Sequence, residues 1–278
     1  MHKQEQTYQL PESTGKEVRR MIIWMAWFFG VLSLLVIVFL IYAPTLMKLV
    51  PFSAEKKFVR PYEEFADKWW DGESHDEITA YLQELTDRLS KAMELKEEIQ
   101  IQAHYITSEE VNAFAVLGGH IFITKGLMQA VDNENALAMV VAHELAHQKN
   151  RDPITSLSRG LAVQLIYTLA TSDYSQFDLS GLGANVGLNY FSREQEALAD
   201  EAAMYALQTH YGHVSGYDQF FRVVLDVHEG HENIPEWLST HPDTQSRIDE
   251  LEQIKVENNW QLGEATPLPE EILRLIQE

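Results

Sequence analysis

Residues 143–147 read His-Glu-Leu-Ala-His. Two histidines four residues apart lie on one face of an α-helix, so both imidazoles can reach a single metal ion. The glutamate beside the first histidine then lies at the edge of that metal, where its carboxylate can take a proton from a bound water. This pattern is typical of zinc hydrolases, and it predicts His143 and His147 as ligands and Glu144 as the general base.

The residues around this motif predict a buried helix. From Ala136 to Ala146 every residue outside the motif is apolar, as in a helix that is covered on all sides. Burying two histidines and a carboxylate is costly unless a partner compensates them, and a divalent cation does so. The alternative is a core helix in which the three polar side chains have three separate partners. The apolar surroundings favour the metal.

The third ligand must come from elsewhere in the chain. Met-turn zincins supply a histidine six residues after the second one, and that position here is Pro153, which excludes this class. The other solution is a glutamate from a later helix, and residues 185–209 fit. Arg193, Glu196 and Asp200 share one helix face by their spacing. We therefore predict that Glu196 is the third ligand. We also predict that Asp200 and Arg193 lie next to the ligands and that Asp200 orients one of the ligating imidazoles. An exposed helix with charged pairs is the alternative.

These two motifs, in this order, resemble the gluzincin metalloproteases of metallopeptidase family forty-eight. Two further stretches match the family pattern. Residues 111–124 resemble its strand ahead of the active helix, and Thr240-His241-Pro242, followed by Arg247-Ile248, resembles its late His-Pro segment. The resemblance covers residues 79–254, and four motifs in the correct order make it specific.

This resemblance implies an endopeptidase that cuts membrane-associated or misfolded polypeptides, with one Zn²⁺ per chain held by His143, His147 and Glu196. Multi-span members such as HtpX and the CAAX prenyl endopeptidase carry several membrane helices, whereas this chain has one convincing span. It is therefore closest to the single-span or soluble bacterial members that act in the cell envelope.

The convincing span is Ile22–Ala43, which contains no charged residue and matches the roughly 20 residues needed to cross a bilayer. A cleavable signal peptide is the competing interpretation. Its apolar core would be only about 7–15 residues long and would end in a small-x-small site, which Ile41-Tyr42-Ala43 fits poorly. We therefore expect an uncleaved, single-pass anchor. Basic residues flank the span on both sides: Lys16, Arg19 and Arg20 precede it, and Lys48, Lys56, Lys57 and Arg60 follow it. The nearer cluster, ahead of the span, favours a cytoplasmic N-terminus and an exported catalytic domain, on the periplasmic side if the protein is bacterial.

The rest of the chain predicts a mostly helical α+β catalytic domain with a small sheet, behind the anchor. Apolar spacing predicts a helix over 75–95, alternation predicts a strand over 99–105, and Gly118-Gly119 predicts a hairpin within 111–124. Helices then continue to the end, which is an α+β layout. We expect five segments along the chain: a polar tail at 1–20, a transmembrane anchor at 21–43, a juxtamembrane linker at 44–73, a zinc metalloprotease domain at 74–256 and a peripheral C-terminal tail at 257–278.

The amino-acid composition limits the classes of partner that the protein can bind. The 42 acidic residues exceed the 21 basic ones, and a net charge of −21 disfavours nucleic acid. The absence of cysteine excludes disulfides and thiol chemistry. The expected partners are a polypeptide substrate and the lipid bilayer, and no feature of the sequence fixes the oligomeric state.

Substrate contacts can also be predicted. An extended peptide needs partners for its backbone, and an edge strand provides them. The stretch ahead of the motif helix, Asn112-Ala113-Phe114-Ala115, can serve. The oxyanion formed on attack needs a donor besides the metal. The position of His241 in the family pattern makes it the candidate for this donor. A purely structural role for His241, as a turn residue ahead of the last helix, is an equal alternative.

Other histidines and other functions stay open. His210/His213 and His228/His231 have an i,i+3 spacing that could bind a metal, but they lack a nearby constellation of carboxylates like that of the motif helices, and solvated helix ends and loops explain them as well. The chain could also be a low-turnover zinc-fold binding or chaperone-like module, or a zinc amidohydrolase of non-peptide substrates. The intact Glu144 argues against the binding module, because holding the metal alone does not need this residue.

Overall fold

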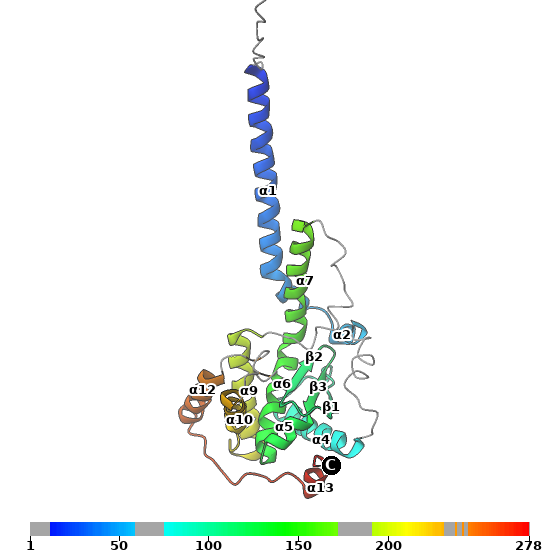
Figure 1. Ribbon diagram of the computed structural model, residues 1–278, viewed down its shortest axis with the longest axis vertical. Helices are drawn as coiled ribbons and strands as arrows, with labels where there is room; N and C mark the ends of the chain where they lie inside the picture. The colour runs from blue at the N-terminus through cyan, green and yellow to red at the C-terminus, as the bar shows by residue number, and fades with distance from the viewer. Residues whose placement is uncertain are drawn as a thin grey trace, which may run out of the picture.

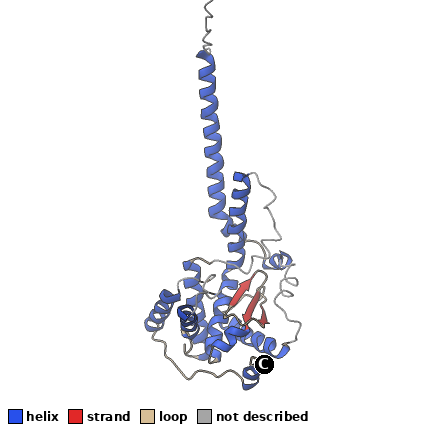
Figure 2. Cartoon of the chain, in the orientation of Figure 1, coloured by secondary structure: helices blue, strands red, loops and turns tan. Residues whose placement is uncertain are grey.

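The computed structural model describes residues 12–58, 75–171, 191–230, 237, 241 and 244–277. Helices surround a small three-stranded sheet, and one long helix extends away from this body (Figure 1). Helix is by far the most abundant secondary structure (Figure 2). The α+β class predicted from the sequence is confirmed. Most of the expected linker, from residue 59 to 73, lies outside the described residues.

The long helix is α1 (Glu12–Met47), followed by the short α2 (Phe52–Phe58). Within α1, Gly15–Met47 is long and apolar enough to cross a membrane, and its most apolar stretch has a mean hydropathy of 2.6 and is not buried. The helix therefore exposes its apolar side chains instead of contributing them to the core of the domain.

The first helix of the domain is α4 (Asp76–Ala92). Its buried apolar residues are spaced by three and four, as the sequence predicts for a helix with one core face: Ile78, Leu82, Leu85, Leu89. Each such side chain stabilises the fold by about 1.5–3 kcal/mol through its burial. The helix ends earlier than expected, because Glu94 adopts a left-handed conformation with φ 52°.

The sheet consists of β1 (Gln102–Ile106), β2 (Ala113–Val116) and β3 (His120–Thr124), in the order β1-β3-β2. β2 and β3 pair antiparallel, which confirms the predicted hairpin, and β1 pairs parallel to β3. Gly119, in the hairpin loop, has φ +91°, and a Cβ there would lie 2.2 Å from the carbonyl oxygen of Gln100. Only glycine fits this close approach.

After the short α5 (Lys125–Ala130), the motif helix α6 runs from Glu134 to Asn150. The Asn133 side chain caps its start by accepting from the Ala136 amide at 2.9 Å. Arg151, with φ 61°, ends it. Every residue from Glu134 to Gln148 is buried, so α6 forms the centre of the domain, as its apolar sequence predicts.

Helices cover α6 on its remaining sides. α7 (Asp152–Thr171) leads away from it, and α9 (Arg193–Tyr211) packs along it through small side chains, Ala199, Ala203 and Ala206 among them. α10 (Gln219–Gly230) and α12 (Thr244–Glu257) complete this side. The chain then returns to α4 with α13 (Glu270–Leu275).

The C-terminal residues take part in the core. We expected a peripheral tail after residue 256, but Leu268, Ile272 and Ile276 are buried in the main hydrophobic cluster. The Thr266 amide also donates to the Asn135 side chain at 2.7 Å, next to the start of α6. The prolines in this segment misled the sequence prediction, because they break helices without preventing an extended chain from packing.

Candidate metal centre

Helix α6 brings the three motif residues to one buried place. His143 and His147 are one turn apart, their ring centroids are 4.7 Å apart, and their Nε2 atoms lie 3.1 Å from each other. Both side chains and that of Glu144 are buried. The structure therefore shows the arrangement that the spacing predicts.

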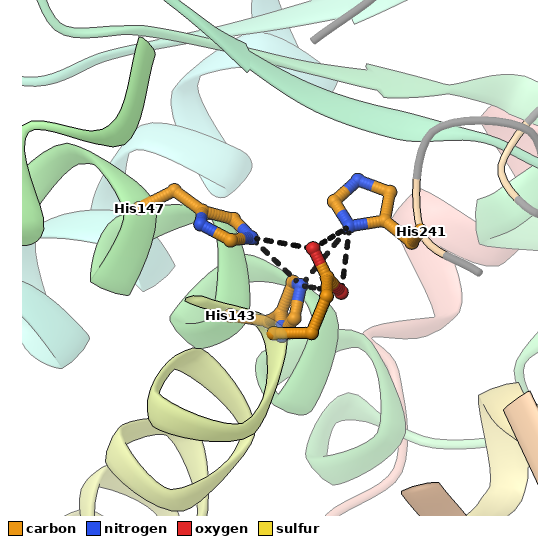
Figure 3. Close-up of side chains that lie close together, drawn as sticks. His143, His147 and His241 are labelled. Carbon is orange, nitrogen blue, oxygen red and sulfur yellow. Dashed lines mark hydrogen bonds and ion pairs between the residues drawn. The ribbon is translucent and has the colours of Figure 1, made fainter. Parts of the chain in front are cut away.

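Glu196 from α9 and His241 complete the cluster. One ligand atom from each of His143, His147, Glu196 and His241 lies within 4.8 Å of the others. The Glu196 carboxylate is 3.5 Å from His143 Nε2, 3.4 Å from His147 Nε2 and 3.0 Å from His241 Nδ1. Figure 3 shows the three imidazoles pointing toward one another, and the distances place the Glu196 carboxylate among them. Three nitrogens and a carboxylate oxygen are ligand types that zinc prefers.

Carboxylates outside the cluster orient both motif histidines. His143 Nδ1 is 2.9 Å from Asp200 Oδ1, and His147 Nδ1 is 2.9 Å from Asp152 Oδ2. These contacts assign the proton of each ring to Nδ1 and leave the lone pair of Nε2 facing the centre. Such contacts fix ligand orientation in metal sites. Asp200 thus lies beside His143, one of the predicted ligands.

Asp152 was missed. Its other carboxylate oxygen accepts from Gln195 Nε2 at 2.6 Å, so α9 holds it in place. Gln195 also closes the capping box of α9 with Ser192. The signal for Asp152 was its position just after the motif helix, but only the left-handed turn at Arg151 directs it back toward His147.

Arg247, not Arg193, is the arginine of the site. Arg193 lies exposed in the first turn of α9. Arg247, from α12, is buried and donates to both oxygens of Asp200 at 2.7 Å, while its Nη1 lies 2.8 Å from Glu196 Oε2. Its guanidinium also lies over the rings of Phe221 and Trp237, 4.8 Å from each centroid. The resemblance of the late His-Pro segment had included Arg247 without giving it a role.

The electrostatics of the site favour a cation at its centre. Burial lowers the pKa of His147, but hydrogen bonds to Asp152 and Glu196 outweigh it and raise that pKa to about 9. Burial likewise lowers the pKa of His143, but the contacts with Asp200 and Glu196 outweigh it, so that this pKa is also raised. Burial raises the pKa of Glu196, yet the surrounding histidines hold it well below its usual range.

The side chains present therefore fit a divalent metal ion. Four buried carboxylates surround the imidazoles, those of Glu144, Asp152, Glu196 and Asp200, and among the described residues Arg247 is the one permanent cation in contact with them. Such an excess of buried negative charge is stable only when a proton or a metal ion balances it.

Glu144 differs from the other carboxylates. It is fully buried, and neither of its oxygens has a hydrogen-bond partner among the described residues. His241 Nε2 lies 3.7 Å from one of them. A buried carboxylate with free acceptor atoms beside a ligand cluster is poised to accept a proton.

Aromatic rings enclose the cluster. Phe191 stacks on His147 with ring centroids 3.8 Å apart, and Trp237 stacks on His241 at 4.8 Å. The His241 amide donates to the Trp237 carbonyl at 2.8 Å. These rings exclude water from the histidines and limit their rotation.

The predicted substrate strand, β2, is one of the two edge strands of the described sheet. β2 pairs with β3 on one side only, and it contacts α6. The Thr124 amide donates to the Asn112 carbonyl, so residues 112 and 114 face β3, and the backbone groups of Ala113 and Ala115 point the other way. Ala113 and Ala115 are buried, and Phe114 stacks on Phe122.

The other histidine pairs form no such cluster. His210 and His213 have no third metal-ligand side chain grouped with them among the described residues. His231 lies outside the described residues, and the His228 side chain does too.

Comparisons with known proteins agree with this geometry. A family model described as Peptidase family M48 matches residues 76–255. The chain is similar to the beta-barrel assembly-enhancing protease of Escherichia coli (strain K12), 29% identical over 191 residues, which are 62% of this chain and 37% of that protein. The protein of the same name from Yersinia pestis is 28% identical over 192 residues, 62% of this chain and 37% of that protein.

A third relative comes from a eukaryote. The mitochondrial metalloendopeptidase OMA1 of Schizosaccharomyces pombe is 29% identical over 187 residues, 65% of this chain and 54% of that protein. The aligned part of the chain thus spans between 37% and 54% of the length of these relatives.

Proposed function

The chain belongs to peptidase family M48, as its motifs predict, and from this premise we propose that it is a membrane-anchored zinc metalloendopeptidase of unfolded, misfolded or membrane-associated polypeptides. The observation that carries the proposal is the cluster of His143, His147 and Glu196 with the unpartnered carboxylate of Glu144 beside it. The chain is similar to proteins named as a protease and as a metalloendopeptidase, which supports the same class of activity.

Each residue has a role in this proposal. His143, His147 and Glu196 would hold the metal, and zinc bound there would lower the pKa of a water toward neutrality and polarise the peptide carbonyl. Glu144 takes the proton of the attacking water and later delivers it to the leaving nitrogen. Neither of its oxygens has a hydrogen-bond partner among the described residues, so both can accept from the water.

His241 lies next to two of these residues. Its Nδ1 faces Glu196 at 3.0 Å, and its Nε2 faces Glu144 at 3.7 Å. We propose that His241 acts on the reacting carbonyl as the donor to the oxyanion. Asp200 and Asp152 hold the two motif histidines, and Arg247 holds Asp200 and Glu196.

The first experiment measures metal and peptidase activity together. Purified full-length protein in detergent should contain one zinc per chain and cleave an unfolded protein such as casein. His143→Ala, His147→Ala and Glu196→Ala should lose the metal. Glu144→Gln should retain zinc and lose activity, because it keeps the shape of the side chain but cannot take a proton. Full zinc in Glu196→Ala would remove Glu196 from the ligand set.

This assay also separates the alternative functions. A binding or chaperone-like module would hold unfolded protein without cleaving it, and Glu144→Gln would change nothing. A zinc amidohydrolase would leave casein intact while hydrolysing small amides in a Glu144-dependent way. Either result would contradict the proposed peptidase.

We further propose that substrate binds as an added strand on the edge of β2, with Asn112 contributing a side-chain hydrogen bond. Proline at Ala113 removes an amide that points away from β3 and should reduce cleavage while zinc stays bound. Proline at Phe114 is the matched control, since its amide faces β3, and it should impair folding instead. An Ala113→Pro variant that folds, binds zinc and cleaves at the wild-type rate would exclude this strand as the platform.

The orientation of the anchor is the last part of the proposal. We propose that the catalytic domain lies outside the cytoplasm, tethered by residues 22–43. Protease added to intact bacterial spheroplasts should then digest the domain. A domain that is protected until the cells are lysed contradicts this orientation.

A further inference from the structure

Helix α7 contains a second apolar segment that the proposed chemistry does not use. After Arg159, residues 160–172 carry no charge, and α7 continues as a helix to Thr171. Twelve helical residues are about 18 Å long, too short to cross a hydrocarbon layer of about 30 Å but longer than one leaflet of it. The segment therefore cannot cross a membrane alone.

The structure places this segment beside the anchor. α7 contacts α1, and it runs alongside the end of α1 that is nearer to the domain (Figure 1). In α1 the partly or fully buried residues are Val36, Leu40, Ala43, Pro44 and Met47, and their spacing of three and four places them on one face. Val36 and Met47 are about 16 Å apart along the helix. The contact thus extends well into the segment 22–43.

An ion pair joins the start of α7 to the base of the anchor. Arg151, at the junction of α6 and α7, donates from Nε to Glu55 Oε1 at 2.6 Å and from Nη2 to the Val50 carbonyl at 2.7 Å. Glu55 is buried in α2, directly after the anchor. The base of α1 and the base of α7 are therefore held together at the surface of the domain.

We infer that the apolar end of α7 inserts into the leaflet that α1 crosses, so that the domain meets the membrane through two helices and the lipid hydrocarbon is the partner of α7. This inference rests on the proposed anchoring by α1. If residues 22–43 of α1 lie in hydrocarbon, the part of α7 beside Val36 and Leu40 lies at the same depth. Because Asp152, at the start of α7, contacts His147, the insertion also sets the distance of the metal centre from the membrane surface.

Spin labels on the full chain in lipid vesicles test the inference directly. The chain has no cysteine, so one introduced cysteine is the one site of labelling. Leu161→Cys and Gln164→Cys report on α7. Ile41→Cys, 62% exposed in α1, and Leu198→Cys, 51% exposed in α9, are the membrane and water controls. Relaxation by oxygen, which concentrates in lipid, is compared with relaxation by a water-soluble paramagnetic chelate.

At position 164 we expect the ratio of relaxation by oxygen to relaxation by the chelate to match the ratio at position 41 and to exceed the ratio at position 198. The ratio at 164 should also be higher than the ratio at 161. A ratio at 164 equal to that at Leu198 would place α7 in water and overturn the inference. Low relaxation by both reagents would mean that protein, such as a second copy of the chain, covers α7, and this also overturns it. An aqueous Ile41 would overturn the anchor together with the inference, whereas a lipid-exposed Ile41 with an aqueous 164 overturns the inference alone.

Discussion

Replacing Arg247 with methionine should destabilise the domain strongly. The side chain is buried, neutralises Asp200 and Glu196 at 2.7–2.8 Å, and lies over two aromatic rings. Methionine keeps most of the volume but removes the charge, so two carboxylates remain buried without their cation. Removing one partner of a buried ion pair costs about 3–5 kcal/mol. In a chain of this size 1 kcal/mol shifts the Tm by about 2–4 °C, so the expected loss is about 6–20 °C.

The matched control is the same substitution at Arg222. Arg222 also pairs with an aspartate at 2.7 Å, that of Asp218, but its side chain is 62% exposed. An exposed pair contributes about 0–1 kcal/mol, so Arg222→Met should lower the Tm by no more than about 4 °C. Thermal unfolding of the full chain in detergent, followed by far-UV circular dichroism with saturating zinc, compares the two variants.

The same measurement with a chelator strengthens the comparison. Without the metal, Arg247 is the one permanent cation that the described residues place against these carboxylates, so the loss caused by Arg247→Met should become larger. If the Tm of Arg247→Met stays within 2 °C of that of Arg222→Met in both conditions, the buried carboxylates do not need this guanidinium. The electrostatic account of the site would then be refuted.

Three further predictions concern other residues. Asp152→Asn should weaken metal binding by about 10- to 100-fold, because His147 loses the carboxylate that orients it; competition with a chromophoric chelator measures this, and the exposed Asp249→Asn should bind as the wild type does. Arg151→Asn should lower the free energy of unfolding by about 3–5 kcal/mol, because asparagine tolerates the left-handed backbone but leaves Glu55 buried and unpaired. Burial raises the pKa of Glu55 even beside Arg151, and a folded-state pKa above the unfolded one means that protonation favours the folded state. Urea titrations should therefore show that the variant regains stability as the pH falls through that pKa. A loss of stability that is independent of pH would contradict this. Gly119→Ala should destabilise the protein more than Gly212→Ala does in the same urea titration. Both glycines have positive φ, but a Cβ at 119 would lie 2.2 Å from the Gln100 carbonyl oxygen, whereas a Cβ at 212 would meet nothing within 4 Å. Equal losses of stability would show that backbone strain alone decides.

Local sequence patterns determined much of this protein. The spacing of His143 and His147 in an apolar run predicted a buried ligand helix, and the face shared by Glu196 and Asp200 predicted the second one. Alternation and a double glycine predicted the hairpin. Each of these signals lies within a few residues of the chain, where helix and strand periodicity alone decide which side chains share a face.

Only the tertiary structure decided which distant residues complete the site. Arg247 and His241 approach the motif helix from elements about one hundred residues later, and no periodicity predicts which arginine pairs with Asp200. Asp152 reaches His147 because Arg151 takes a left-handed conformation that Glu55 holds from the base of the anchor. The buried C-terminal residues and the contact between α7 and α1 have the same origin. These contacts form when separate elements pack together, and packing depends on the whole chain because buried charges must find partners wherever the fold brings them.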